Sequence, residues 1–327
     1  MSARLCALRR SAALWHVALV PILLGSAPAL AQDAGLEPEQ AAAAAVYDQR
    51  VVGELLDRQG AGPLPESAVP FRAFTLAHAS GNSVLARHEL YLALGEGDAA
   101  RGRERARLGI LLGGQDVTQM RPGDRIILPA NPSDFDLDPR AFAPFPLEYP
   151  GAARLGKLVV VHKDVQAWAA YEDGRLVRWG PASTGARETP APSGRFTINW
   201  RAEERISSES PPGQEWRMRW VLNFHFRRGI HIHQYAAVPV GAPQGIGCVR
   251  VVEADARWLY AWADPWTTTA GRGALGGRVL REGTTVLVLG EDTGLPGVRF
   301  RETPEGGVER VVVALPADPM RVPRGDR

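Results

Sequence analysis

The chain has 327 residues, 38 Lys and Arg against 36 Asp and Glu, and a formal net charge of +2. This near-neutral balance gives no electrostatic argument for binding nucleic acid, so we expect no nucleic-acid partner. The length is sufficient for one large domain or two ordinary domains, each with its own core.

Residues 1–31 have the organisation of a secretory signal peptide. The basic start MSARLCALRR is followed by the apolar run AALWHVALVPILLG and by APALA, whose small residues predict cleavage before Gln32. The apolar run contains Pro21 and is short for a membrane span, and no later segment approaches that length. The sequence therefore predicts an exported protein of the periplasm or cell wall, with no membrane span after signal cleavage.

Residues 32–130 are predicted to form a small, mainly helical accessory region. Residues 33–62 are rich in Ala with apolar positions at helical spacing, and residues 82–97 and 100–113 predict two further short helices. The region ends in DVTQMRPGDRIILPA, a turn followed by a short apolar strand. This ending resembles the end of a LysM module, a small glycan-binding fold. A LysM-like end and a plain helical region both remain open.

The composition changes after residue 130. Residues 131–154 are predicted to be an extended linker, because 131–152 contain five prolines and no apolar periodicity. From there to residue 290 the sequence predicts a mainly β domain made of short strands such as KLVVVHK, QAWAAYEDG, RLVRWGPAS and GTTVLVLGE. EADARWLYAWADPW (253–266) is the one clear helix. Residues 291–327 predict a terminal hairpin and a tail that frays after Pro316.

Cys248 is the only cysteine that remains after signal cleavage, because Cys6 lies in the signal peptide. A lone cysteine in an exported protein indicates an intermolecular disulfide or a reactive thiol, and a buried inert cysteine is the alternative. In GIGCVRVVEADARWL it follows a glycine turn and precedes a helix. Glycine at 247 allows the amides of Gly247 and Cys248 to approach a substrate carbonyl, as an oxyanion hole requires. Arg250 falls on the same face of an extended segment, where it can favour the thiolate or bind a carboxylate.

RGIHIHQYAAVPVGAPQGIGCVRV resembles the active-site stretch of the L,D-transpeptidases, the YkuD-type family, in which a histidine precedes Ser-His-Gly-Cys-x-Arg. Upstream, the Ser-Thr-Gly and Thr-Pro-x-x-Ser-Gly-x-Phe succession in PASTGARETPAPSGRF is similar to the family's, and the resemblance covers roughly residues 155–290. It implies a mixed β-sandwich with one helix after the nucleophile. It also implies an enzyme of cell wall biogenesis and cell shape that acts on peptidoglycan stem peptides through a cysteine thioester, without a cofactor.

The same resemblance assigns roles to individual residues. It makes Cys248 the nucleophile, with Gly247 beside it in the oxyanion hole, and it places Arg250, Tyr235 and Gly245 among the substrate-binding residues.

Either His231 or His233 is the general base. Both lie on one face of a strand, because the side-chain period of a strand is two. The family's spacing from Gly229 favours His233, whereas a Gly-Ile-His alignment favours His231. We expect His233 to act as the base and the other histidine to support it.

The chain departs from the family at Gly245-Ile246, where Ser-His is usual. Isoleucine can neither donate a hydrogen bond to an oxyanion nor tune a thiolate. Three functions therefore remain open: an L,D-transpeptidase, an L,D-carboxypeptidase or endopeptidase of the same family, and a non-catalytic wall-binding protein.

A zinc site built on His225, His231 and His233 is a rival to thiol chemistry, but no further ligand follows nearby, so we predict no metal. The loop RAEERISSESPPGQEWR (201–217) lies between two predicted strands and is either a lid over the cleft or a solvated loop. Trp216 and Trp220 beside it are candidate walls of the cleft. The oligomeric state stays open.

Overall fold

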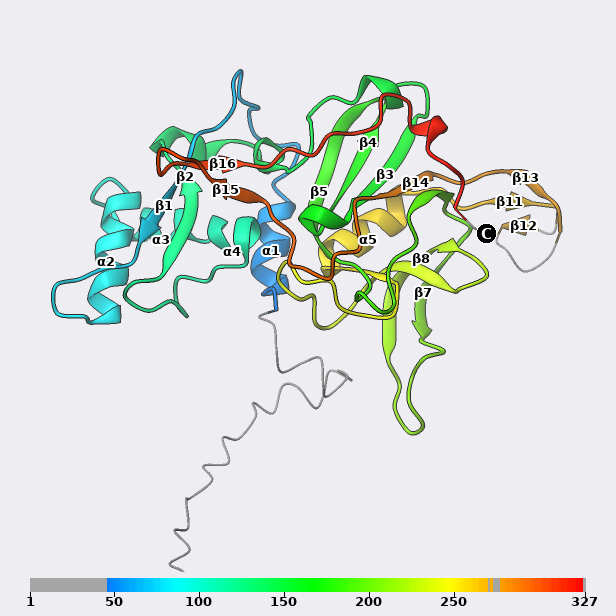
Figure 1. Cartoon of the computed structure of the whole chain (residues 1–327), viewed down its shortest axis with the longest axis horizontal. Helices are drawn as coiled ribbons and strands as arrows, with labels where there is room; N and C mark the ends of the chain where they lie inside the picture. Colours follow the sequence, from blue (N-terminus) through cyan, green and yellow to red (C-terminus); the bar gives the residue numbers. More distant parts are fainter. Residues whose placement is uncertain (1–45, 270, 273–276, 326–327) are drawn as a thin grey trace, which may run out of the picture.

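The computed structural model describes residues 46–269, 271–272 and 277–325 (Figure 1). The predicted signal peptide and the first part of the Ala-rich segment lie outside these residues. The helices are α1 (Gln49–Leu56), α2 (Ser83–Leu94), α3 (Ala99–Ala106), α4 (Leu108–Gly113) and α5 (Glu253–Trp262). The strands are β1 (Phe71–Thr75), β2 (Arg125–Pro129), β3 (Lys157–His162), β4 (Ala167–Glu172), β5 (Arg175–Ser183), β6 (Gly194–Thr197), β7 (Trp200–Ile206), β8 (Arg217–His225), β9 (Ile230–Gln234), β10 (Val249–Val251), β11 (Thr267–Thr268), β12 (Gly271–Arg272), β13 (Val279–Arg281), β14 (Thr285–Leu289), β15 (Phe300–Glu302) and β16 (Val308–Arg310).

A nine-stranded mixed sheet dominates the fold, in the order β6-β14-β3-β4-β5-β10-β9-β8-β7. β14 runs parallel to β3 and β10 runs parallel to β9, and the other neighbours are antiparallel. The helix expected after the cysteine is α5, which packs against β8 and β9. The prediction of a mainly β, mixed-sheet fold with one helix after Cys248 is therefore confirmed.

The central strands have both faces buried, which explains their nearly continuous apolar sequences. In β3, Val159 and Val161 join the core that contains α5, whereas Leu158 and Val160 face a second core shared with the accessory region. The β4–β5 connection turns at Asp173 and Gly174, which have φ of 49° and 78°, the left-handed pair that a tight hairpin requires.

A buried ion pair joins α5 to the sheet. The Asp255 carboxylate is fully buried, and it accepts hydrogen bonds from Arg178 Nε and Trp168 Nε1, both at 2.9 Å. Arg178 Nη2 also donates to Asp57 Oδ1 at 3.1 Å, just after α1. Gly180 is required here, because a Cβ on it would lie 1.8 Å from Asp255 Oδ2. The pair thus connects α5, β5 and the accessory region.

The described part of the accessory region contains the four helices α1–α4 and, in addition, the two short strands β1 and β2. The two helices expected at 82–97 and 100–113 are present, the second divided into α3 and α4, but they lie between β1 and β2, which pair antiparallel. β1 was not predicted, because it follows directly on the turn-rich connector GPLPESAVP. The terminal hairpin β15–β16 is present as expected, and it extends the same sheet in the order β15-β16-β1-β2 (Figure 1).

Two segments expected to be extended or loose are packed. Residues 131–154 contain three short 3-10 turns, and their aromatic residues belong to the core shared with the sheet: Phe135, Phe142, Phe145 and Tyr149. The tail does not fray after Pro316, because Arg195 N donates to Pro323 O at 2.9 Å and Gly325 N donates to Arg195 O at 3.0 Å. The proline-rich sequence of both segments suggested that they are exposed to solvent. Instead, apolar contacts hold the first segment against the core, and backbone hydrogen bonds hold the second.

Replacing Asp255 by Ala should destabilise the protein strongly, because it leaves the buried Arg178 guanidinium without its main partner. We expect a loss of about 3–5 kcal/mol in the free energy of unfolding, measured by urea unfolding with tryptophan fluorescence. Asp264→Ala is the control. Its carboxylate pairs with Lys157 at 3.2 Å but is 47% exposed, so we expect a loss below about 1 kcal/mol. Equal losses in the free energy of unfolding of the two variants would contradict the stabilising role of the buried Asp255–Arg178 pair.

Candidate active site

The site is built on the parallel pair β9 and β10. Val249 pairs with Ile232, and Arg250 pairs with His233, so Cys248 continues the register opposite His231. Because side chains alternate along a strand, these four polar residues share one face. The opposite face carries Ile230, Ile232, Val249 and Val251, all in the core beside α5. The hydrophobic pattern therefore fixes which side chains face outwards.

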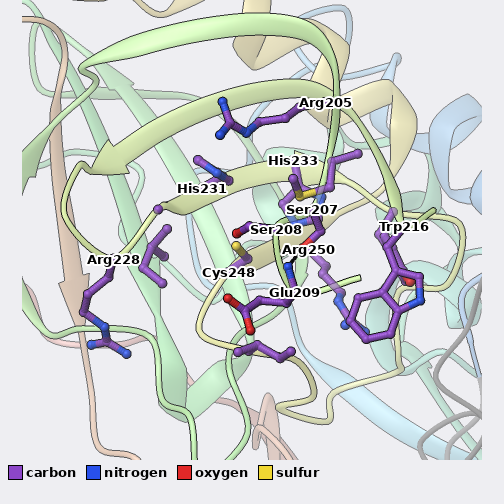
Figure 2. Close-up of a pocket in the computed structure, with 15 residues that line it drawn as sticks. Arg205, Ser207, Ser208, Glu209, Trp216, Arg228, His231, His233, Cys248 and Arg250 are labelled. Carbon is purple, nitrogen blue, oxygen red and sulfur yellow. Dashed lines mark hydrogen bonds between the residues drawn. The ribbon is translucent and has the colours of Figure 1, made fainter. Parts of the chain in front are cut away.

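The polar face opens into a cavity of about 280 Å³ (Figure 2). Its described lining includes Cys248, both histidines, Arg250 and Tyr235. The β7–β8 loop adds Ser207, Ser208, Glu209 and Trp216, as expected of a loop over the cleft. Internal hydrogen bonds brace this loop: Ser207 N donates to Trp216 O, and Trp216 N donates to Ser210 Oγ, both at 3.0 Å. Figure 2 shows Cys248, Ser208 and Glu209 in the middle of the lining, with Arg228 and Trp216 on opposite sides.

Cys248 is a free, half-buried thiol. Burial raises the pKa of this thiol to about 11, although a hydrogen bond with the His231 backbone and the positive charge of Arg250 partly offset the effect. Glu209 raises the pKa further. At neutral pH the resting site therefore holds the neutral thiol, and a base must accept its proton when it reacts.

His233 has a tautomer suited to that task. Its Nδ1 lies 2.8 Å from Gln234 O, and a carbonyl oxygen only accepts, so Nδ1 carries the hydrogen. Burial lowers the pKa of His233 to about 4, although the bond to Gln234 opposes the shift. The ring is therefore neutral at pH 7, and its Nε2 has a free lone pair that can accept a proton.

His231 is held in the opposite tautomer. Its Nδ1 lies 3.1 Å from Asn223 Nδ2, which also lies within donating distance of the Ile230 carbonyl, and Asn223 Oδ1 accepts a hydrogen bond from Asn199 Nδ2 at 2.8 Å. This network makes Nδ1 an acceptor, so Nε2 carries the hydrogen. Burial lowers the pKa of His231 to about 3. Although His231 is directly opposite Cys248, it can donate a hydrogen bond into the site but cannot readily accept a proton at Nε2.

Arg250 lies buried at the cavity wall. Its Cζ lies 4.4 Å from the centroid of the Tyr235 ring, a cation–π contact. A Cβ on Gly245, whose φ is 129°, would lie 3.1 Å from Arg250 Nη2. Tyr235 and Gly245, expected from the resemblance to bind substrate, thus both lie against the arginine: Tyr235 contacts its guanidinium, and the absence of a side chain at Gly245 leaves room for it. Gly247 has a φ of 86° and lies directly before the cysteine, so only glycine adopts this turn without strain.

Other residues singled out in the sequence are placed differently. Ile246 lines the cavity and is 38% exposed, which makes it an apolar wall where the family usually has histidine. His225 does not line the cavity, and the described residues contain no group of three metal-ligating side chains. Trp220 packs against Tyr260 of α5, with ring centroids 5.4 Å apart, and forms no wall of the cavity.

Several cavity residues were not identified from the sequence. Arg228 lies in a polar stretch with no distinguishing pattern, and Arg205 and Glu209 were not singled out within the loop 201–217, yet all three line the cavity. Asn223 did carry a signal, since it is a single amide within the apolar strand WVLNFHF and is fully buried. Buried amides need partners, so such a residue indicates a polar network.

Residues 156–288 match the sequence profile of the L,D-transpeptidase catalytic domain, YkuD. This segment is a YkuD-family domain. It contains the whole β9–β10 pair, Cys248 and both histidines.

Solved structures of L,D-transpeptidases are similar to this chain. One from Xylanimonas cellulosilytica is 26% identical over 69% of this chain and 100% of that chain, with a TM-score of 0.36. One from Stackebrandtia nassauensis is 22% identical over 43% of this chain and 58% of that chain, with a TM-score of 0.32. One from Mycobacterium smegmatis is 18% identical over 41% of this chain and 59% of that chain, also with a TM-score of 0.32. The match therefore spans less than two thirds of the latter two structures. No curated protein matches the sequence.

The charge of Glu209 should lower the reactivity of the YkuD-domain thiol. Glu209→Gln removes a negative charge that raises the pKa of Cys248, so the thiolate fraction at pH 8 should increase. We expect iodoacetamide to alkylate this variant roughly two- to fivefold faster than wild type, followed by mass spectrometry. In both proteins the rate should keep rising from pH 7 to 10, because the thiol pKa is about 11.

The matched control is Glu215→Gln in the same loop, whose carboxylate pairs with Arg217 and does not line the cavity. Its alkylation rate should equal that of wild type. A plateau of the wild-type rate below pH 8 would contradict the neutral resting thiol.

Proposed function

We propose that the protein is an exported, cysteine-dependent peptidoglycan L,D-transpeptidase that acts on stem peptides through a Cys248 thioester. One observation carries the proposal: within a YkuD-family domain, a free thiol shares the polar face of two parallel strands with a histidine whose Nε2 can accept a proton. Family members are L,D-transpeptidases, which supports an acyl-transfer enzyme. The apolar, cleavable-looking start of the sequence supports export.

The proposed reaction starts from the neutral Cys248 thiol and the neutral His233 ring. Cys248 Sγ attacks the carbonyl carbon of the donor peptide bond while His233 Nε2 accepts the thiol proton. His231 Nε2–H and the amides near Gly247 are candidate donors to the oxyanion. The C–N bond then breaks, the departing amine takes the proton from His233, and a thioester remains. An acceptor amine attacks this thioester and forms a new C–N bond while the C–S bond breaks, and the amine proton passes through His233 to Cys248 Sγ, which restores the thiol.

The charges of the cavity are consistent with an anionic peptide. Three arginines, at positions 205, 228 and 250, line it together with the acidic Glu209. A stem peptide with free carboxylates would gain charge-assisted hydrogen bonds there. Among the alternatives, a carboxypeptidase or endopeptidase would use water as acceptor, and a wall-binding protein would bind the peptide without forming the thioester.

Purified mature protein should convert tetrapeptide-bearing wall fragments into cross-linked products, and Cys248→Ala should abolish the conversion. Mass spectrometry separates the outcomes: dimers indicate transfer, shortened peptides indicate hydrolysis, and intact peptides with wall binding indicate the non-catalytic alternative. A carbapenem should add its own mass to wild type and not to Cys248→Ala. Absence of both turnover and adduct would refute the enzyme.

The two histidines should differ in importance. His233→Ala removes the proton acceptor, so the second-order rate of carbapenem acylation at pH 7 should fall roughly 10²- to 10⁴-fold. His231→Ala removes a donor and should cause a smaller fall. Stopped-flow fluorescence measures both rates, and thermal melting of each variant controls for misfolding. A larger loss of acylation rate in His231→Ala than in His233→Ala would make His231 the base instead.

A further inference from the structure

α1 lies outside the YkuD-family segment, yet its first residue contacts the backbone on both sides of the site. Gln49 Nε2 donates to Tyr235 O at 2.7 Å and to Ala236 O at 2.8 Å, and Gln49 Oε1 accepts from Glu253 N at 3.0 Å. Tyr235 and Ala236 follow β9, which carries the histidines, and Glu253 begins α5, just after β10. One amide side chain therefore bridges the ends of the two strands that form the site.

Gln49 is itself firmly placed. Tyr47 N donates to Val238 O at 3.0 Å, and Val46 forms an antiparallel bridge with Pro239, so the chain before α1 runs along the β9–β10 connection. Asp48 caps α1 by accepting from Arg50 N and Val51 N. Close packing completes the arrangement, since a Cβ on Gly53 would lie 3.2 Å from Ala254 Cβ in α5.

The contacts of Gln49 lie next to the hydrogen bond that sets the His233 tautomer. The Gln234 carbonyl accepts the His233 Nδ1 hydrogen, and the next two carbonyls both accept from Gln49. Three successive carbonyls are thus engaged, which fixes the peptide planes that end β9. Without Gln49, two carbonyls lose a partner and the peptide plane that holds the ring can turn.

We propose that Gln49 is a positioning residue, supplied by the accessory region, that holds His233 in the Nδ1–H tautomer and keeps the β9 and β10 ends in register. Its catalytic consequence rests on the proposed function, in which His233 Nε2 accepts the thiol proton. Its structural consequence, the tautomer of His233, does not depend on that function.

The test compares Gln49→Glu with Gln59→Glu in the full mature protein. Gln49→Glu keeps the shape of the side chain but removes the N–H groups that bind the two carbonyls. Gln59 makes an equivalent contact away from the site, because its Nε2 donates to Trp179 O at 2.7 Å and its Oε1 accepts from Trp179 N at 2.9 Å. The control therefore makes the same substitution, at a glutamine of the accessory region whose amide also binds the backbone.

We expect Gln49→Glu to lower carbapenem acylation at pH 7 by about tenfold or more, since small displacements of a catalytic group are costly. Alkylation at pH 10, where hydroxide forms the thiolate without His233, should stay within about twofold of wild type. Gln59→Glu should leave both rates unchanged. Equal losses of acylation rate in the two variants, or an unchanged acylation rate in Gln49→Glu, would overturn the proposed effect of Gln49 on catalysis.

Nitrogen-15 NMR of labelled histidine tests the tautomer directly, with the His233 signals assigned by their loss in His233→Ala. Wild type and Gln59→Glu should show a protonated Nδ1, and Gln49→Glu should show a mixture of tautomers. An unchanged tautomer in folded Gln49→Glu would refute the proposal. If wild type forms no acyl adduct while its tautomer still depends on Gln49, the proposed function fails and the positioning role stands.

Discussion

Parallel pairing of β9 with β10 is the constraint on which the rest of the site depends. The pairing sets Ile230, Ile232 and the valines of β10 against α5, and the same alternation turns both histidines, the thiol and Arg250 outwards. A shift of either strand by one residue would turn these polar side chains into the core and expose its apolar residues, so hydrophobic burial enforces this register. Positive φ at Gly245 and Gly247 lets the chain enter β10 in this register.

Burial also sets the chemical character of the site. The thiol is partly and both imidazoles are almost fully removed from water, and desolvation keeps all three neutral. The tautomers of the two rings are set by their hydrogen bonds, that of His233 with a carbonyl and that of His231 with a buried amide. Such a site has little free thiolate and resists adventitious oxidation, since the thiolate is the reactive form. In the proposed mechanism, reactivity at neutral pH therefore depends on the placement of His233, which accepts the thiol proton.

Local patterns predicted much of this protein. Period-two alternation placed Cys248 with Arg250 and His231 with His233, and helical spacing located α5. The accessory sheet and the tail contacts could not be predicted, because they join residues far apart in sequence, such as Phe71 with Val308 and Arg195 with Pro323. The choice between the two histidines also required the fold, since it depends on Asn223 and on the Gln234 carbonyl.

The terminal hairpin β15–β16 has a consequence for how the molecule folds. It completes a sheet begun by β1, with Phe71 opposite Val308, so the accessory region closes only when the last part of the chain is available. Contacts of such high sequence separation form slowly and late. Excised at its borders, the family segment would expose the sheet face around Tyr171 and Trp179, which the accessory core normally covers.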